Sequence, residues 1–249
     1  PPRSTPLYSS AASDVYKRQI YYSFLKAQNK KPQLYLEYKK NNFTMDSPNL
    51  TFMRRARQQL SSLWGLAAGI TIVYVLITGI PPQFDESLIL LVLLISGPMQ
   101  LGYAIFCLNV VRNNDPRFEN LFEGFQSFGN VFLSYLLVGF ATAVGLVLFI
   151  IPGIIVALGL SMTFYVLAVD RSLSAVEADK KSWALMDGHK MQLFGLILGF
   201  IPWYLLTFLT LFIGAIFVIP WQNVAIANFY EKAKSVIKLN KYLKYHIFL

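Results

Sequence analysis

The side chains that could do acid, base or metal chemistry are few in this sequence, and they do not fall into a catalytic set. His189 lies in the run DGHK, and His246 lies close to the end of the sequence. A metal centre needs several His, Cys or carboxylate ligands in register. Asp187 and His189 cannot act as a dyad without a nucleophile beside them. We therefore predict a protein that is not an enzyme and that carries no cofactor and no metal.

The candidate binding residues are polar rather than catalytic. His189 and Lys190 are candidate contacts for a lipid headgroup, and a capping or interfacial histidine is the alternative for His189. The uncharged candidates in apolar stretches are Asn109, Thr163, Tyr165, Gln222, Asn223 and Asn228. Two interpretations stay open for them. They form hydrogen bonds between helices, each worth about 1 kcal/mol, or they form a substrate site.

The charged residues are scarce and segregated. The chain is 55% hydrophobic and 14% charged, whereas a soluble domain has about 25% charged residues. Four stretches contain no charge, and they are 63–80, 88–111, 131–169 and 191–228. Uncharged apolar stretches of about 18 or more residues are typical of membrane spans. The pattern predicts an all-α, polytopic membrane helical bundle.

Two of these stretches are too long for one span each. Pro152 and Gly153, in FIIPGII, divide the stretch 131–169 into a tight hairpin of two spans, because proline suits the first turn of a new helix. The stretch 191–228 divides near 207–214. The six predicted spans are about 63–80, 88–111, 130–150, 152–169, 191–208 and 212–229. Pro98, Pro202 and Pro220 interrupt apolar segments, either as simple kinks or as breaks that expose backbone at a binding site.

The basic residues predict the orientation. All fourteen Lys and Arg of residues 45–249 fall on one side of the six predicted spans, and the opposite loops hold none. Lys and Arg are retained on the cytoplasmic side of a membrane. We therefore predict a multi-pass protein of the bacterial cytoplasmic (inner) membrane with both termini in the cytoplasm, N-in and C-in.

Three cytoplasmic segments are amphipathic. In PRFENLFEGFQSFGN, aromatic residues recur at helical spacing. In SLSAVEADKKSWALMDGHK, Ser174 and Glu177 have the spacing of a capping box, and Val176, Trp183 and Met186 predict its apolar face. Both segments are interpreted as helices at the membrane interface or packed on the bundle end. The basic tail, 236–249, is predicted to contact the anionic inner leaflet or to anchor the last span.

The first 44 residues differ in character from the rest. Residues 1–19 resemble a translated sequencing-library adaptor when written back into codons, so we expect an artefact without structure. Residues 20–44 are either translated leader, with the true start at Met45 or Met53, or an authentic Lys-rich arm. Residues 1–44 hold eight Lys and Arg against two Asp and Glu. Without them the net charge of +9 falls to +3, and the case for nucleic acid as a partner is lost.

Several segments together resemble a known family. They are FEGFQSFGNVF, LFIIPGIIVALGLSMTFYVLAVD, LSAVEADKKSWALMDGHKMQLFGL and LTLFIGAIFVIPWQNVAIANFYEKAK. They look like the bacterial integral membrane proteins called domain of unknown function 975, over most of 53–235. That resemblance implies a multi-span membrane protein with no established activity. More loosely, the chain resembles the membrane domain attached to some glycerophosphodiester phosphodiesterases, but the catalytic domain of those proteins has no counterpart in it.

These observations favour a non-catalytic, membrane-embedded binding or scaffold module in the region 45–235. Its expected partners are membrane lipids, a second copy of the chain or another membrane protein. The alternative is a transporter of an uncharged or lipid-like substrate, because the prolines could break helices around a binding site. No span contains an ionisable residue, which argues against proton or ion coupling through buried carboxylates.

Overall fold

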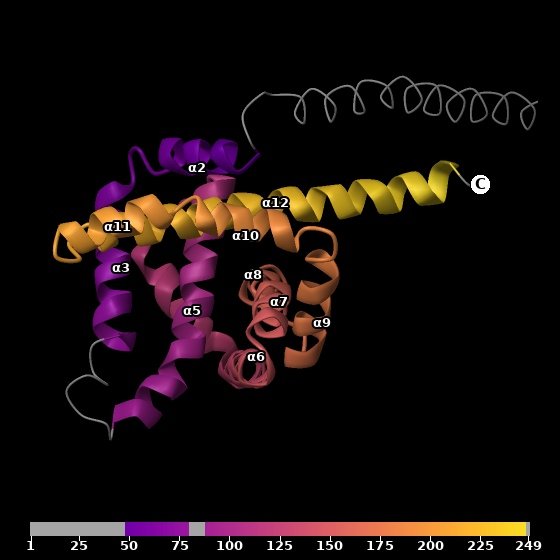
Figure 1. Ribbon diagram of the computed structural model, residues 1–249, viewed down its shortest axis with the longest axis horizontal. Coiled ribbons are helices and arrows are strands. Elements are labelled where there is room, and N and C mark those ends of the chain that lie inside the picture. Colours follow the sequence, from indigo (N-terminus) through magenta and orange to yellow (C-terminus); the bar gives the residue numbers. More distant parts are fainter. Residues whose placement is uncertain (1–47, 80–87, 248–249) are drawn as a thin grey trace, which may run out of the picture. The chain divides into compact units, whose positions relative to one another are not determined.

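A computed structural model describes residues 48–79 and 88–247 (Figure 1). Every regular element in these ranges is a helix. In chain order they are α2 (Pro48–Gln59), α3 (Trp64–Thr78), α5 (Ile89–Arg112), η2 (Phe118–Ser127), α6 (Phe128–Leu148), α7 (Ile150–Leu160), α8 (Thr163–Val169), α9 (Ala175–Leu185), α10 (Lys190–Leu198), α11 (Ile201–Leu209) and α12 (Ala215–Ile247). The predictions for 1–19, 20–44 and Met45 lie outside the described residues.

The helices have the length and composition of membrane spans. Four segments of the described residues qualify, and they are Ile89–Arg112, Phe118–Leu148, Ile150–Val169 and Lys190–Leu209. A fifth is reached if α2 and α3, which meet at a bend of 102°, count as one span. The predicted span 212–229 is not among them, because Gln222, Asn223 and Asn228 dilute the apolar part of α12. The all-α prediction is confirmed for the described residues, and six spans remain a prediction.

Helix α5 is the centre of the fold and packs against α3, η2, α6, α8 and α12. Its residues from Met99 to Leu108 are almost all buried, Gln100 being the exception. Helix η2 lies directly against α5, because each contributes a glycine. A Cβ on Gly102 would lie 1.8 Å from the carbonyl oxygen of Leu121, and one on Gly124 would lie 1.9 Å from that of Pro98. Only glycine allows this backbone contact.

The predicted hairpin between 130–150 and 152–169 is present. Helix α6 ends at Leu148, and α7 begins at Ile150, so the extended residue Phe149 is the whole connection. Pro152 therefore lies inside the first turn of α7 rather than at the break, where proline is readily accepted. A Cβ on Gly153 would lie 2.6 Å from the backbone nitrogen of Leu146, so this glycine lets α6 and α7 touch.

The other prolines behave in two ways. Pro98 and Pro220 are buried inside the continuous helices α5 and α12, so neither breaks its helix. Pro202 lies in the first turn of α11, directly after the break between α10 and α11. The predicted division near 207–214 is found between Leu209 and Ala215.

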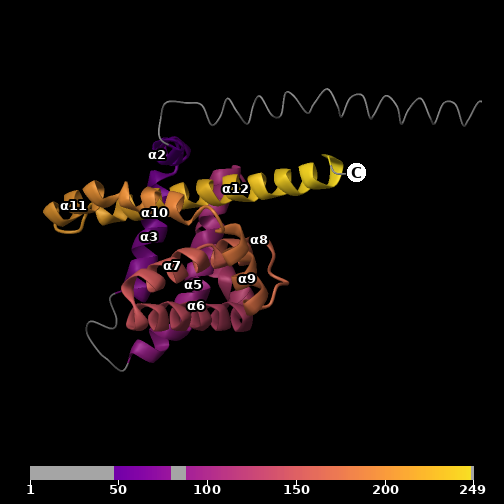
Figure 2. The same cartoon turned by 45° about the vertical axis from the view of Figure 1, so that its right-hand side comes forward.

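Helix α12 crosses α3 and α5 rather than running alongside them (Figure 1). It continues as one helix as far as Ile247. The predicted tail, 236–249, is therefore an extension of the last apolar helix and not a separate segment over its described part. Figure 2 shows the same crossing from a second direction, with α6 and α7 beneath it.

The glycine contact between α5 and η2 predicts a sharp difference between two glycine substitutions. Gly102→Ala should lower stability by about 1–3 kcal/mol, because the added methyl group overpacks the contact with Leu121. Gly139→Ala, in α6, meets nothing within 4 Å and should be neutral or stabilising by up to about 1 kcal/mol. Thermal unfolding in detergent measures both. Equal unfolding temperatures for the two variants would contradict the contact.

Candidate functional site: a polar cavity between five helical segments

A cavity of about 260 Å³ lies in the described part of the chain between α3, α5, the α7–α8 region, α10 and α12. Its lining residues are Tyr74, Gln100, Tyr103, Ala104, Ser161, Phe164, Tyr165, Leu193, Ile197, Ile219, Asn223 and Ile226. None of these described lining residues is charged. The site therefore offers hydroxyl and amide groups in a mainly apolar wall, as small-molecule pockets commonly do.

Two tyrosines form part of the wall and are held in place by hydrogen bonds. The hydroxyl of Tyr103 lies 2.8 Å from Oγ1 of Thr71, which itself donates to the carbonyl oxygen of Ala67. The Tyr103 hydroxyl is therefore the donor to Thr71, because threonine has only one hydroxyl hydrogen. Tyr165 donates to the backbone carbonyl of Asn223 at 3.2 Å. These bonds tie α3 to α5 and α8 to α12 at the cavity.

Gln100 is the exposed residue within the buried part of α5, and its side chain lines the cavity. Its amide carries both donors and an acceptor. Asn223 contributes a second amide, whose nitrogen donates to the carbonyl of Ile219 at 2.9 Å. Asn223 and Gln100 come from α12 and α5, so two amides from different helices border the same space. The chemistry on offer is hydrogen bonding to an uncharged polar group.

The remaining uncharged candidates lie elsewhere. Gln222 accepts a hydrogen bond from the hydroxyl of Tyr204, which links α12 to α11. Asn228 donates to Oε1 of Gln59 at 2.6 Å and to the carbonyl of Val224. Asn109 is half-buried on α5 and does not line the cavity. The hydrogen-bonding interpretation therefore suits Gln222 and Asn228, whereas Asn223 belongs to the cavity.

The predicted contacts His189 and Lys190 lie at the start of α10, away from the cavity lining. His189 occupies the N-cap position, with Nδ1 2.8 Å from the carbonyl oxygen of Asp187. The ammonium group of Lys190 lies 3.8 Å from the ring centre of Trp183, a cation–π contact. These residues connect α10 to α9.

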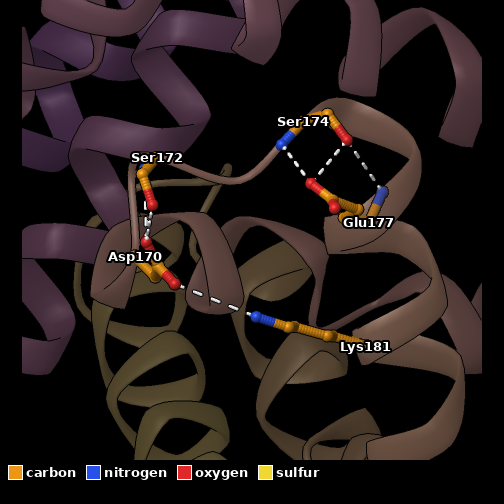
Figure 3. A network of polar contacts seen from close by, with 5 residues as sticks. All are labelled: Asp170, Ser172, Ser174, Glu177 and Lys181. Atoms are coloured by element: carbon orange, nitrogen blue, oxygen red, sulfur yellow. Dashed lines mark hydrogen bonds and ion pairs between the residues drawn. The ribbon is translucent and has the colours of Figure 1, made fainter.

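Helix α9 carries the predicted capping box. Ser174 accepts from the backbone nitrogen of Glu177, whose carboxylate accepts from Ser174 in return (Figure 3). Of the predicted apolar face, Met186 is fully buried, whereas Val176 and Trp183 are 48% and 42% exposed. Packing on the bundle therefore suits Met186, and the membrane-interface alternative stays a prediction for Val176 and Trp183. The face that packs inward consists of Ala175, Ala178, Ser182 and Leu185.

The connection from α8 to α9 is held by polar contacts. Asp170 accepts from the backbone and hydroxyl of Ser172 and pairs with Lys181 at 3.8 Å (Figure 3). The hydrogen bonds from Ser172 lower the pKa of Asp170. Asp179, in contrast, is partly buried, which raises its pKa although Thr163 donates a hydrogen bond to it. These contacts fix α8 and α9 beside the cavity wall.

The aromatic segment before α6 is both packed and exposed. Leu121 of η2 is completely buried against α5, whereas Phe118, Phe122 and Phe125 are between 37% and 43% exposed. Glu123 of the same helix pairs with Arg171, at the end of α8. The two interpretations of this segment are therefore combined in one helix, with one face in the fold and an aromatic face outside it.

One family model matches part of the chain. Residues 140–236 match the family model described as "Protein of unknown function (DUF975)". The predicted family is confirmed. The DUF975 segment supplies Ser161, Tyr165 and Asn223 of the cavity wall, whereas Gln100 and Tyr103 precede the matched residues. No curated protein and no solved structure matches the chain.

Gln100 was not predicted as a binding residue from the sequence, because it lies within the long apolar stretch 88–111. The signal was nevertheless present, since an amide within the uncharged stretch 88–111 needs a hydrogen-bonding partner or a polar space. Tyr74 and Ser161 carried no such signal, because both residue types are common in helices and at turns. Only the packing of α3 and α8 on α5 brings them together.

The opening of the cavity at Gln100 predicts selective labelling of introduced cysteines. Gln100→Cys should react readily with a small uncharged maleimide in detergent solution. Met99→Cys should stay unreacted under the same conditions, because Met99 is fully buried. The unmodified chain is the control, since its one cysteine, Cys107, is also fully buried. Mass spectrometry measures the labelled fraction, and equal labelling at 99 and 100 would contradict the cavity.

Proposed function

We propose that this chain is an integral protein of the bacterial cytoplasmic membrane that binds an uncharged ligand in the cavity beside α5. The observation that carries the proposal is the pair of amides, Gln100 and Asn223, in a wall whose other described residues are aromatic or aliphatic apart from Ser161. A charged ligand would be costly to bury in this cavity, because no lining residue offers an opposite charge. An uncharged group with a donor and an acceptor suits the two amides.

The proposed role is binding and not catalysis. The described cavity wall offers tyrosine and serine hydroxyls and two amides, but no carboxylate, histidine or lysine that could move a proton near neutral pH. Ser161, the one aliphatic hydroxyl, donates to the carbonyl of Leu158 at 2.7 Å. A nucleophilic serine needs a general base beside it, and the described lining residues include none.

The proposed topology places both termini in the cytoplasm, with an even number of spans. Contacts between segments predicted on the same side support it. Arg112, at the end of α5, pairs with Glu231 of α12, and Arg171, just after α8, pairs with Glu123 of η2. Each pair joins two segments that the positive-inside rule assigns to the cytoplasm.

The proposed lipid partner is the anionic inner leaflet, and α2 supplies much of the basic surface. Arg55 and Arg57 are exposed on α2, while Phe52 and Ala56 are buried on its other face. Partial burial lowers the pKa of Lys232 on α12, and repulsion from Arg55 lowers it further. Cationic side chains from α2 and α12 therefore lie near each other. Such a cluster attracts anionic lipids, at about 1 kcal/mol for each Lys or Arg near the membrane surface.

Transport of the same ligand is a second candidate, and one observation favours it. The apolar segment Lys190–Leu209 is broken between α10 and α11, and Leu193 and Ile197 of α10 line the cavity. Broken helices next to a binding site are a common feature of transporters. Substrate-dependent flux in proteoliposomes separates the two roles.

The ligand itself can be sought by native mass spectrometry on the full chain in mild detergent. We expect one uncharged ligand to remain bound at a fixed stoichiometry. Gln100→Leu combined with Asn223→Leu should abolish its retention, because both amides of the cavity are lost. Asn109→Leu, on α5 but outside the cavity, should retain the ligand. Equal retention by all variants, or none by the unmodified chain, would overturn the proposed binding role.

The orientation can be tested on intact cells with single cysteines in a Cys107→Ala background. Phe149→Cys, at the tip of the α6–α7 hairpin, should react with a membrane-impermeant maleimide. Asn114→Cys, between α5 and η2, should react only after the membrane is opened. Both native residues are exposed, so accessibility alone does not separate them. Reaction of Asn114→Cys before Phe149→Cys would reverse the proposed topology.

A further inference from the structure

A second cavity lies beside the first, between α3 and the region around the start of α12. It measures about 370 Å³, and its lining residues are Thr71, Ile72, Val75, Leu76, Phe212, Ala215, Ile216 and Ile219. Thr71 brings the one polar side chain among these described residues, and its hydroxyl is occupied by Ala67 and Tyr103. We call this second cavity the apolar groove, because the surface that it presents to a ligand is hydrocarbon.

The polar cavity and the apolar groove share a wall. Ile219 lines both of them. The hydrogen bond between Tyr103 and Thr71 also crosses the boundary, since Tyr103 lines the cavity and Thr71 lines the groove. Ile219 and the Tyr103–Thr71 pair thus lie where a space with two amides adjoins a space with none.

The groove is open on its outer side. Ile72, Val75 and Leu76 of α3 are 36% to 51% exposed, and Phe212 is 65% exposed. Phe212 and its neighbour Leu211 both have positive φ, at 66° and 51°. Such a conformation costs non-glycine residues of the order of 1 kcal/mol or more. This turn holds Phe212 at the edge of the groove.

We propose that the cavity and the groove form one site for an uncharged amphiphile with a single acyl chain. The polar group of the amphiphile lies against Gln100 and Asn223, and its acyl chain lies in the groove between α3 and the start of α12. This inference rests on the proposed binding function and adds to it the class of ligand. An acyl chain is the occupant that the groove fits, because seven of its eight described lining residues are apolar and the Thr71 hydroxyl is already hydrogen-bonded. The exposed side of the groove lies on α3, which counts toward a membrane span together with α2. A polar occupant would gain no hydrogen bond there.

The two halves make separate contributions to affinity. Burying an acyl chain removes hydrocarbon from water, so affinity should rise with chain length as long as the groove is free. The two amides contact only the polar group of the ligand, so their loss should weaken the binding of long and short ligands alike. These dependences distinguish a joined site from two unrelated cavities.

The test uses monoacylglycerols as probes, with the full chain in detergent and binding followed by native mass spectrometry. Monobutyrin is the short probe and monoolein the long one. We expect monoolein to bind at least tenfold more tightly than monobutyrin. Ile216→Trp, which fills the groove, should remove that difference and leave monobutyrin binding unchanged. Leu76→Trp fills the groove from α3 and serves as the second variant if Ile216→Trp does not fold.

The controls separate the inference from the function on which it rests. Phe140→Trp places the same side chain on an exposed site of α6 and should leave the preference for monoolein intact. Equal affinities for the two probes, unaffected by either groove variant, would overturn the joined site and leave the polar cavity standing as a binding site. Failure of both probes to bind the unmodified chain would overturn the ligand class and the binding function together.

Discussion

The close approach of backbones at α5 is the constraint on which the remaining helices depend. Helices in a membrane gain little from hydrophobic burial against each other, so small residues that permit van der Waals contact decide where they pack. Gly97 meets Tyr135 of α6, and Gly102 meets η2. With two neighbours fixed in this way, α5 leaves its other side to α3, α8 and α12. The cavity lies on that other side, where larger side chains keep the helices apart.

The polar groups of the fold divide into those that satisfy each other and those that face the cavity. Ser182 of α9 donates to the carbonyl of Gly159 and accepts from the backbone nitrogen of Met162, so it ties α9 to the junction of α7 and α8. Asn228 and Gln59 satisfy each other between α12 and the end of α2. Paired groups of this kind stabilise the fold, whereas the amide of Gln100 faces a cavity.

Much of the helical framework could be predicted because it depends on local signals. The hairpin at Pro152 and Gly153 and the capping box at Ser174 each have a signature of a few residues, whereas the division before Ala215 followed from the length of the uncharged stretch 191–228. The cavity had no such signature, because it needs Tyr74, Gln100 and Asn223 to meet from three helices distant in the sequence. On α9 the inward face could not be predicted for a related reason. It includes the small residues Ala178 and Ser182, and the ring of Trp183 lies against Gly159 of α7 although Trp183 is 42% exposed.

Helix α2 determines how much of the N-terminal sequence the fold needs. Phe52 is 2% exposed and packs edge-on against Phe229, and the carbonyl of Met53 accepts a hydrogen bond from the indole of Trp221. A chain that began at Met53 would lose Phe52 and expose the ring of Phe229. The indole bond would then depend on a residue at a charged, mobile chain end. Removal of the residues before Met53 would therefore take away the first part of α2 and its packing on α12.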